Sequence, residues 1–477
     1  MQVQLLLCKT YTLFAHQIIL IDSATRISTL GLANEEADAA QKFFDEKINH
    51  IFQLNGAESS LSIVKIDTAK EEYKTLEAAR KAGNAISKFL NAKKITEASV
   101  FNASRKIKLT AAFAEGLALS NYEFLKYKTK EKKEKSLIAL HVDSKSCDKK
   151  TLEDLSKIVA ANFFARTLIN EPLSYLTATQ LSKEIQQAGK DNGFSVTVFD
   201  KKKIESLKMG GLLSVNKGSV DPPTFTLLEY KGYRPKNKKP IVLVGKGVVY
   251  DTGGVSLKPT PNSMDMMKCD MSGAAAVTGI FIAAAQLKLP VHIVGLIPAT
   301  DNRPGGNAYV PGDVVEMMSG INVEMLNADA EGRMILADAL HYAKQYSPEL
   351  VFDFATLTGA AKAATGGVAS PFMGTAGDGV KKKLLNSADN TYERLIEFPL
   401  WDEYGDMIKS DVADIKNVGG PEAGSITAGK FLEHFTDYPW LHFDIAGTAY
   451  LMTEDGYRGK YGTAVGVRLI TDFLKNY

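Results

Sequence analysis

Charged side chains stand beside small and apolar residues in three short stretches of the chain. In the first, "NADAEGR", Asp329, Glu331 and Arg333 occupy every second position. A charge removed from water costs on the order of several kcal/mol unless it is paired or bound to a metal ion, so these side chains require partners elsewhere in the fold.

The other two stretches supply further carboxylates and lysines. "VGKGVVYDTGGVSLKP" contains Lys246, Asp251 and Lys258, and "MKCDMSGAAA" contains Asp270. If the four carboxylates of the three stretches converge, they repel one another, and Lys246, Lys258 and Arg333 offset part of that charge. A pair of divalent metal ions would supply the rest. Carboxylate ligands without Cys or His suit Mg, Mn, Co or Zn better than copper or an iron–sulfur cluster.

Each of these residues also has a structural interpretation. Asp270 could cap the small-residue helix that follows it, Asp329 or Glu331 could cap the next one, and a lone lysine could be exposed. The glycine-rich turn could hold a phosphate, but it has neither GxGxxG nor GxxxxGK[ST] spacing. We favour a shared site, because the structural alternative would have to hold separately at every position.

Buried strands and helices must position these side chains. Continuous apolar runs predict strands that are covered on both faces, at 240–245, 291–299, 349–358 and 440–447. Ligands of open α/β sheets gather where strands end in loops, and several of the charged residues lie at such ends. Because Asp329 and Glu331 are two residues apart, they point to one side only in an extended segment, which predicts a loop that enters a helix from about Gly332.

The remainder of the chain indicates a second domain. A length of 477 residues suggests two or three domains at roughly 150 residues each. Residues 1–150 alternate β-type runs with amphipathic helical stretches, and 151–170 is predicted to be a long connecting helix. In the Lys-rich segment 127–150, the interleaved Glu131 and Glu134 favour a solvated surface hairpin over a basic face for nucleic acid.

Composition gives no sign of a nucleic-acid or membrane partner, because 57 basic residues against 55 acidic ones leave a net charge of +2. The three separated cysteines, Cys8, Cys147 and Cys269, predict neither a disulfide framework nor a zinc cluster and fit a reducing compartment. Residues 1–22 are interpreted as strands rather than a signal peptide. The apolar segment 271–289 is interpreted as a buried helix.

Taken together, the three stretches resemble the dinuclear-metal leucine aminopeptidases, also called cytosol aminopeptidases. "NADAEGR" is similar to the family signature N-T-D-A-E-G-R, and the other two resemble V-G-K-G-x-x-F-D-S-G-G-x-S-x-K-P and M-K-x-D-M-x-G-A-A. Further similar blocks are "RTLINEP", "PGDVVEMMSGINVEMLN", "ATLTGA", "GSITAGKFL" and "DIAGTA". The resemblance covers roughly residues 166–477 in the family's order, whereas the region before about residue 150 matches only in general pattern.

The resemblance implies a two-domain α/β protein. We expect a smaller N-terminal α/β domain at 1–150, a linker helix at 151–170, and a catalytic domain at 171–477 with a central mixed sheet flanked by helices. The implied protein is a cytoplasmic homohexamer that hydrolyses N-terminal residues from peptides.

The resemblance also implies two metal sites, for Zn or Mn, with Mg or Co as further choices. The tighter site would use Asp251, Asp329 and Glu331, and the more exchangeable one Lys246, Asp251, Asp270 and Glu331. A lysine ligand requires a neutral amine, which an adjacent dication enforces by lowering its pKa.

In such a site, an activated water attacks the scissile carbonyl. Lys258 would stabilise the developing oxyanion, and Arg333 would hold a bicarbonate ion that shuttles the proton. The substrate's α-amine would bind the exchangeable metal. The first side-chain pocket, an apolar set that favours Leu or Met, would be lined by Met267, Thr356, Gly359, Ala446 and Ala449.

The chain departs from the family pattern at Ala328, Tyr250, Thr252 and Ser272, where Thr, Phe, Ser and Gly are usual. None of these changes removes a ligand, although neighbours of ligands can alter metal affinity. Two alternatives remain open: a Cys-Gly-type dipeptidase with the same site, and an additional DNA-binding role of the N-terminal domain that only segment 127–150 motivates.

Overall fold

The protein is described here by a computed structural model that covers residues 2–10, 14–46, 49–56, 59–104, 106–130 and 134–477. The chain forms two compact units, and helix α4 (Lys149–Asn170) runs from the first into the second. Unit 1 comprises Met1–Phe163 and Thr453–Gly459, and unit 2 comprises Phe164–Met452 and Lys460–Tyr477.

Unit 1 contains a six-stranded sheet in the order β1-β6-β5-β2-β4-β3, which is parallel except for the antiparallel pair of β3 and β4. Its strands are β1 (Gln4–Cys8), β2 (His16–Asp22), β3 (Ile51–Asn55), β4 (Ser60–Ile66), β5 (Glu97–Asn102) and β6 (Ala139–Asp143). The strands predicted near the N-terminus are therefore confirmed in β1 and β2, although residues 11–13 lie outside the described residues.

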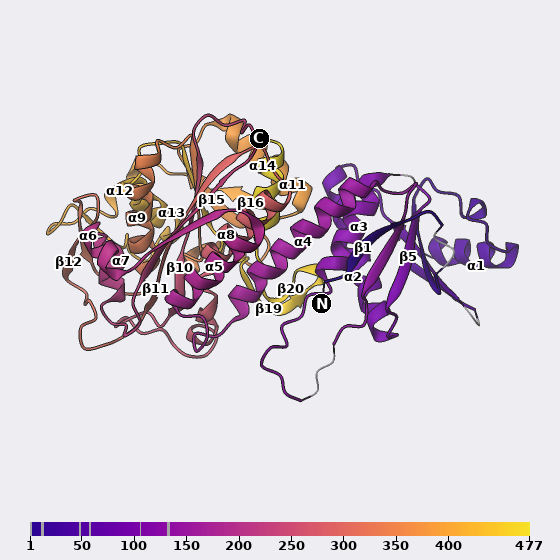
Figure 1. Ribbon diagram of the computed structural model, residues 1–477, viewed down its shortest axis with the longest axis horizontal. Coiled ribbons are helices and arrows are strands. Elements are labelled where there is room, and N and C mark those ends of the chain that lie inside the picture. Colours follow the sequence, from indigo (N-terminus) through magenta and orange to yellow (C-terminus); the bar gives the residue numbers. More distant parts are fainter. Residues whose placement is uncertain (1, 11–13, 47–48, 57–58, 105, 131–133) are drawn as a thin grey trace. The chain divides into compact units, whose positions relative to one another are not determined.

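Helices cover both faces of this sheet. Ile18 and Leu20 of β2 belong to the core that includes α2 (Glu72–Ala92) and α3 (Ile107–Leu119), whereas Ile19 and Ile21 belong to the core that includes α1 (Asn34–Asp45). This alternation explains why the β2 run is apolar throughout. Helices α2 and α3 lie side by side (Figure 1).

The surface hairpin predicted for 127–150 does not form in the described part of that segment. Lys126–Lys130 are exposed loop residues, but Ala139–Asp143 form β6, which lies inside the sheet between β1 and β5. A strand that pairs with partners far away in sequence leaves no local turn signal, which is why the charge pattern misled the prediction. Glu131 lies outside the described residues.

Unit 2 is built on a nine-stranded mixed sheet in the order β16-β15-β18-β14-β9-β11-β8-β7, with β10 paired to β11. The strands β10, β11, β9, β14 and β18 pair in parallel, whereas β8, β7 and β15 join antiparallel. The strands are β7 (Ser195–Phe199), β8 (Thr224–Lys231), β9 (Ile241–Gly245), β10 (Gly247–Asp251), β11 (His292–Asn302), β14 (Leu350–Ala355), β15 (Ser370–Gly374), β16 (Leu395–Glu397) and β18 (Trp440–Asp444). All four strands predicted from apolar runs are confirmed, as β9, β11, β14 and β18.

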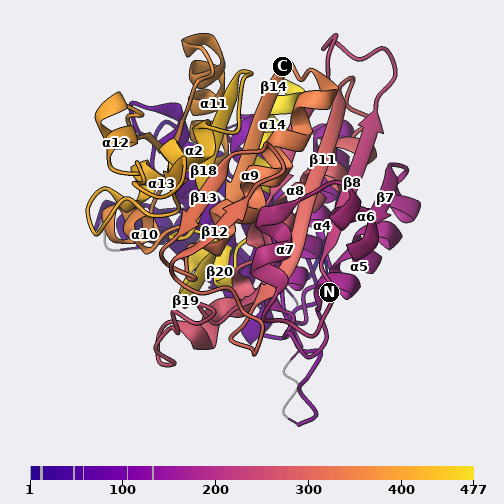
Figure 2. The ribbon, with the colours of Figure 1, turned by 90° about the vertical axis from the view of Figure 1, so that its left-hand side faces the viewer.

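Helices flank the unit 2 sheet, which confirms the expected α/β fold with a mixed sheet (Figure 2). One face carries α8 (Ser272–Gln286), with α5 (Ala178–Asn192) and α14 (Val467–Lys475) against it and α11 (Asp378–Thr391) against α14. The other face of the sheet carries α9 (Glu331–Ala343), and α7 (Gly210–Asn216) and α13 (Gly424–Glu433) pack against α9. Smaller elements are α6 (Lys201–Ser206), α10 (Gly359–Thr365), α12 (Asp402–Asp406), β12 (Asp313–Glu316), β13 (Asn322–Met325), β17 (Ile415–Lys416), β19 (Tyr450–Asp455) and β20 (Gly459–Gly462).

The apolar segment predicted as a buried helix forms α8. In the part of the chain that the structure describes, Met264–Gln286 is the one segment whose length and hydropathy would allow it to cross a membrane, yet 94% of its apolar window is buried inside the protein. Gly273 fits closely here, because a Cβ at this position would lie 1.9 Å from the Phe354 carbonyl oxygen. Small residues thus let the start of α8 approach β14.

Candidate metal centre

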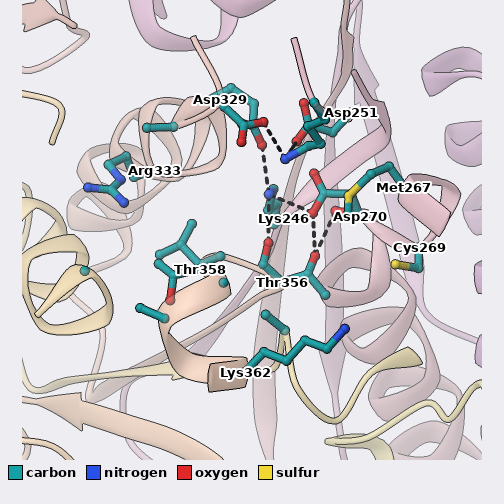
Figure 3. Close-up of a pocket in the computed structure, with 18 of the residues that line it drawn as sticks. Lys246, Asp251, Met267, Cys269, Asp270, Asp329, Arg333, Thr356, Thr358 and Lys362 are labelled. Atoms are coloured by element: carbon teal, nitrogen blue, oxygen red, sulfur yellow. Dashed lines mark hydrogen bonds and ion pairs between the residues drawn. The ribbon is translucent and has the colours of Figure 1, made fainter. Parts of the chain in front are cut away.

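The charged residues of the three stretches meet where strands of the unit 2 sheet end. Lys246 directly follows β9, and Asp251 is the last residue of β10. Asp270 lies between a 3₁₀ turn and α8, Asp329 lies in a turn, and Glu331 is the first residue of α9. All five side chains line one cavity, at the carboxyl ends of parallel strands. Figure 3 shows four of them, Lys246, Asp251, Asp270 and Asp329.

The local backbone differs slightly from the expected extended loop. Helix α9 begins at Glu331, one residue before Gly332, and Asp329 occupies a turn in which the Ala330 amide donates to the Asn327 carbonyl oxygen at 3.1 Å. The turn, rather than an extended segment, brings Asp329 to the same side as Glu331.

Three carboxylates form the centre of the cluster. Asp251, Asp329 and Glu331 each offer an oxygen atom, and these atoms all lie within 4.8 Å of one another. Burial, together with the charges of Asp251 and Glu331, raises the pKa of Asp329 to about 7. Carboxylates this close need cations to offset their repulsion.

Lys246 pairs with the carboxylates on one side of the cluster. Its Nζ lies 2.8 Å from Asp270 Oδ1 and 2.9 Å from Glu331 Oε1, and it donates to the Thr356 carbonyl oxygen at 2.9 Å. Burial by itself would lower the pKa of this amine, but the neighbouring carboxylates outweigh burial and raise it. Burial raises the pKa of Asp270 well above its ordinary value even though Lys246 opposes the rise.

Lys258 pairs with the carboxylates on the other side. Its Nζ lies 2.9 Å from Asp251 Oδ2 and also forms an ion pair with Asp329. Here too burial would lower the pKa of the amine, and the surrounding carboxylates raise it instead. The lysine side chain lines the cavity and is 13% exposed, so it is largely shielded from solvent.

Asn302 and Gly253, which the sequence analysis did not single out, hold Asp251 in place. Asn302 Nδ2 donates to Asp251 Oδ1 at 2.8 Å and to the Ala328 carbonyl oxygen at 2.9 Å, which ties two of the stretches together. The Gly253 amide also donates to Asp251 Oδ1, at 2.8 Å, from a backbone with φ of +85° that favours glycine. A polar residue at the end of a predicted strand was the available signal for Asn302.

The four departures from the family pattern fit their surroundings. Tyr250, Thr252 and Ser272 each donate a hydroxyl to a backbone carbonyl oxygen, at 2.9, 2.8 and 2.5 Å. Ala328 is fully buried, and its methyl group lies 3.2 Å from where a Cβ on Gly254 would stand.

Arg333 extends from the first turn of α9 into the same cavity. Its NH1 donates to the Asn417 carbonyl oxygen at 2.7 Å, whereas its buried Nε has no hydrogen-bond partner among the described residues. Burial lowers the pKa of the guanidinium to about 10, so it remains charged at neutral pH. A buried charged donor without a partner favours an anion beside it.

The cavity has a volume of about 300 Å³ and is continuous with the carboxylate cluster. Of the five residues expected to line the first side-chain pocket, four line this cavity: Met267, Thr356, Gly359 and Ala446. The fifth, Ala449, is fully buried and does not belong to the lining. The lining also includes Lys362 and Tyr450, which the sequence analysis did not identify.

The residues present fit divalent cations. Asp270 Oδ2 is buried and has no hydrogen-bond partner among the described residues, so one carboxylate oxygen of the cluster remains available. The cluster offers hard oxygen ligands at strand ends, beside a cavity that can take a small ligand. Such an arrangement can hold metal ions, activate water and stabilise negative charge.

Comparison with known proteins identifies relatives over most of the chain. A family model described as the cytosol aminopeptidase family, catalytic domain, matches residues 163–471, and the model of that family's N-terminal domain matches residues 25–131. The chain is 44% identical over 454 residues to a probable cytosol aminopeptidase of Chlorobaculum tepidum, covering 89% of this chain and 88% of that protein. A probable cytosol aminopeptidase of Geobacter sulfurreducens is 45% identical over 412 residues, covering 84% and 82%.

A solved structure is also similar. The bottromycin maturation enzyme BotP in complex with Mn aligns with a TM-score of 0.86 and 27% identity, covering 97% of this chain and 99% of that one. The similarity therefore extends over both compact units.

Proposed function

The chain belongs to the cytosol aminopeptidase family, and we propose that it uses two divalent metal ions to remove N-terminal residues from peptides, with a preference for Leu and other apolar residues. The cluster of Asp251, Asp329 and Glu331 within 4.8 Å is the observation that carries this proposal. The assignment as a hydrolase of the aminopeptidase class rests on the family itself.

The two ions would be held as the family pattern implies. Asp251, Asp329 and Glu331 would hold one ion, and Lys246, Asp251, Asp270 and Glu331 the other, with Zn or Mn as the first choices and Mg or Co as further ones. Manganese in the similar BotP structure supports this choice of metals. When bound, such a pair of ions lowers the pKa of water so that a nucleophile forms near neutral pH.

The chain's own residues would prepare the substrate for attack. Lys258, which lines the cavity and is 13% exposed, would donate to the oxyanion that develops on the scissile carbonyl. The substrate's free α-amine would bind the exchangeable ion, which an acylated amine cannot do. This requirement would restrict cleavage to the N-terminus.

Arg333 would hold a bicarbonate ion through its Nε, which has no hydrogen-bond partner among the described residues. Its NH1 already donates to the Asn417 carbonyl oxygen. Bound there, the bicarbonate would serve as the proton shuttle of the reaction, and the contact of Arg333 with Asn417 would fix the guanidinium that holds it. Met267, Thr356, Gly359 and Ala446 would form the first side-chain pocket, and Ala449 would support it from behind.

For the whole chain, we propose an N-terminal domain at 1–150, a linker helix at 151–170 and a catalytic domain at 171–477. We further propose a cytoplasmic homohexamer whose partners are its peptide substrates. Neither the dipeptidase alternative nor DNA binding gains support from a particular contact in the described residues.

The direct test is metal-dependent release of an N-terminal residue. The purified protein is stripped with a chelator and reloaded with Mn or Zn, and hydrolysis of leucyl p-nitroanilide is followed. Activity should disappear on stripping and return on reloading, and N-acetyl-leucyl p-nitroanilide should not be cleaved. Asp329→Asn should be inactive at the same metal concentration, whereas the exposed control Asp411→Asn should match the wild type. Full activity in the stripped protein would contradict the proposal.

A further inference from the structure

The cavity carries a fourth cationic side chain that the proposed chemistry does not use. Lys362 belongs to α10, three residues after Gly359, so the two residues lie on the same face of the helix. Both residues line the cavity. Figure 3 shows the Lys362 side chain running past Thr356 along the part of the cavity that is distant from Asp329.

The other three cations of the lining already have partners. Lys246 and Lys258 each pair with two carboxylates, and Arg333 donates to a backbone carbonyl oxygen. Lys362 is exposed, and in the described parts of the chain neither an ion pair nor a side-chain hydrogen bond engages its ammonium group. Its charge is therefore available to a ligand in the cavity.

Tyr450 provides a second available donor near this ammonium group. Its side chain lines the cavity and is only 9% exposed, and its hydroxyl has no hydrogen-bond partner among the described residues. A Cβ on Gly447, three residues before Tyr450, would lie 3.4 Å from Lys362 Cα, so the segment that leads to Tyr450 packs against α10. The two donors thus flank one part of the lining.

The charge of the whole lining favours an anion at this place. The lining contains four carboxylates and four cationic side chains, so its net charge is zero before any ion binds. Two bound divalent ions would make the net charge positive. An apolar side chain gains contacts with Met267 but nothing from an ammonium group. A side-chain carboxylate could accept from Lys362 and Tyr450 at once, in charge-assisted hydrogen bonds.

We propose that Lys362, assisted by Tyr450, is a specificity-determining residue that lets the first side-chain pocket accept peptides with an acidic N-terminal residue in addition to apolar ones. The inference rests on the proposed aminopeptidase function. The carboxylate that Lys362 recognises belongs to the side chain of the first residue and not to the C-terminus of a dipeptide, because Lys362 shares a helix face with the pocket residue Gly359.

Glutamyl and glutaminyl p-nitroanilides test this inference, because they differ in charge but hardly in shape, and neither carries a C-terminal carboxylate. In the metal-loaded wild type, kcat/KM for the glutamyl substrate should exceed that for the glutaminyl one. Lys362→Met should lower this ratio about tenfold, equivalent to about 1.4 kcal/mol. Lys362→Arg should retain most of the ratio, and the exposed control Lys202→Met all of it. The glutamyl advantage should also shrink at high salt.

The outcomes separate the two levels of the proposal. If the wild type cleaves none of the three substrates in any metal, the proposed function fails and the role of Lys362 with it. If leucyl turnover is normal but Lys362→Met keeps the wild-type ratio of glutamyl to glutaminyl cleavage, only the role of Lys362 is refuted. If Lys362→Met instead impairs Leu-Gly but not Leu-Gly amide, the lysine recognises a C-terminal carboxylate, and the side-chain assignment is wrong.

Discussion

Substitution of Lys258 by methionine removes the ammonium group that we place beside the developing oxyanion while it keeps an apolar side chain of similar length. In the structure this ammonium group lies 2.9 Å from Asp251 Oδ2 and is 13% exposed, so it acts in a largely water-excluded part of the cavity. A positioned donor in such a site stabilises a transition state by about 2.7–4 kcal/mol. We therefore expect kcat for leucyl p-nitroanilide to fall about 10²–10³-fold.

The substitution should not weaken metal binding. Lys258 competes with a metal ion for Asp251 and Asp329, so its loss should leave the affinity of that site unchanged or higher. Steady-state kinetics and metal content by plasma mass spectrometry are measured on the same samples. Lys202→Met is the control, because it makes the same change at an exposed lysine. A Lys258→Met enzyme with full metal content and a kcat within twofold of the wild type would refute the oxyanion role. Loss of the metal in this variant would show instead that Lys258 is needed for metal binding.

Three further predictions concern other parts of the molecule. Asp270→Asn should weaken one of two bound ions at least tenfold by competition with a chelator while the other ion stays bound, because it removes one carboxylate of the proposed exchangeable site. Gly116→Ala should destabilise unit 1 by roughly 1–3 kcal/mol in thermal unfolding, because a methyl group there would lie 2.1 Å from the Arg80 carbonyl oxygen. The control Gly379→Ala in α11 should not destabilise the protein, because a methyl group there would have no atom within 4 Å. Burial raises the pKa of Asp338 from 3.8 to about 7, although backbone hydrogen bonds oppose the rise. Between pH 3.8 and about 7, the folded state therefore keeps a proton that the unfolded state releases. The free energy of unfolding should therefore fall by up to roughly 4 kcal/mol as the pH rises from about 4 to 7, and Asp338→Asn should remove that part of the slope; an unchanged slope would contradict the assignment.

Much of the metal centre could be predicted because its residues follow buried strands. Lys246 and Asp251 stand directly after or at the end of apolar runs, and the parallel arrangement of such runs brings their carboxyl ends together. Asn302 was missed, although it ends β11 in the same manner, because a lone amide carries no charge that demands a partner. Lys362 was missed because an exposed lysine in a short helix looks like any surface lysine until the cavity is seen.

The parts that could not be predicted depend on pairings distant in sequence. Strand β6 inserts between β1 and β5, and Thr453–Gly459 belongs to unit 1 although it lies near the other end of the chain. Nothing in the local pattern of either segment encodes its partner. The turn at Asp329 was also missed, because spacing alone cannot distinguish an extended segment from a tight turn that places two carboxylates on one side.

The central claim is that the carboxylate cluster holds two divalent ions. A crystal structure of the protein loaded with Mn, with anomalous scattering measured above the Mn absorption edge, tests it most directly. We expect two anomalous peaks among Lys246, Asp251, Asp270, Asp329 and Glu331, with Asp251 and Glu331 contacting both. Fully loaded crystals with no peak in the cluster, or with peaks only elsewhere in the molecule, would contradict it.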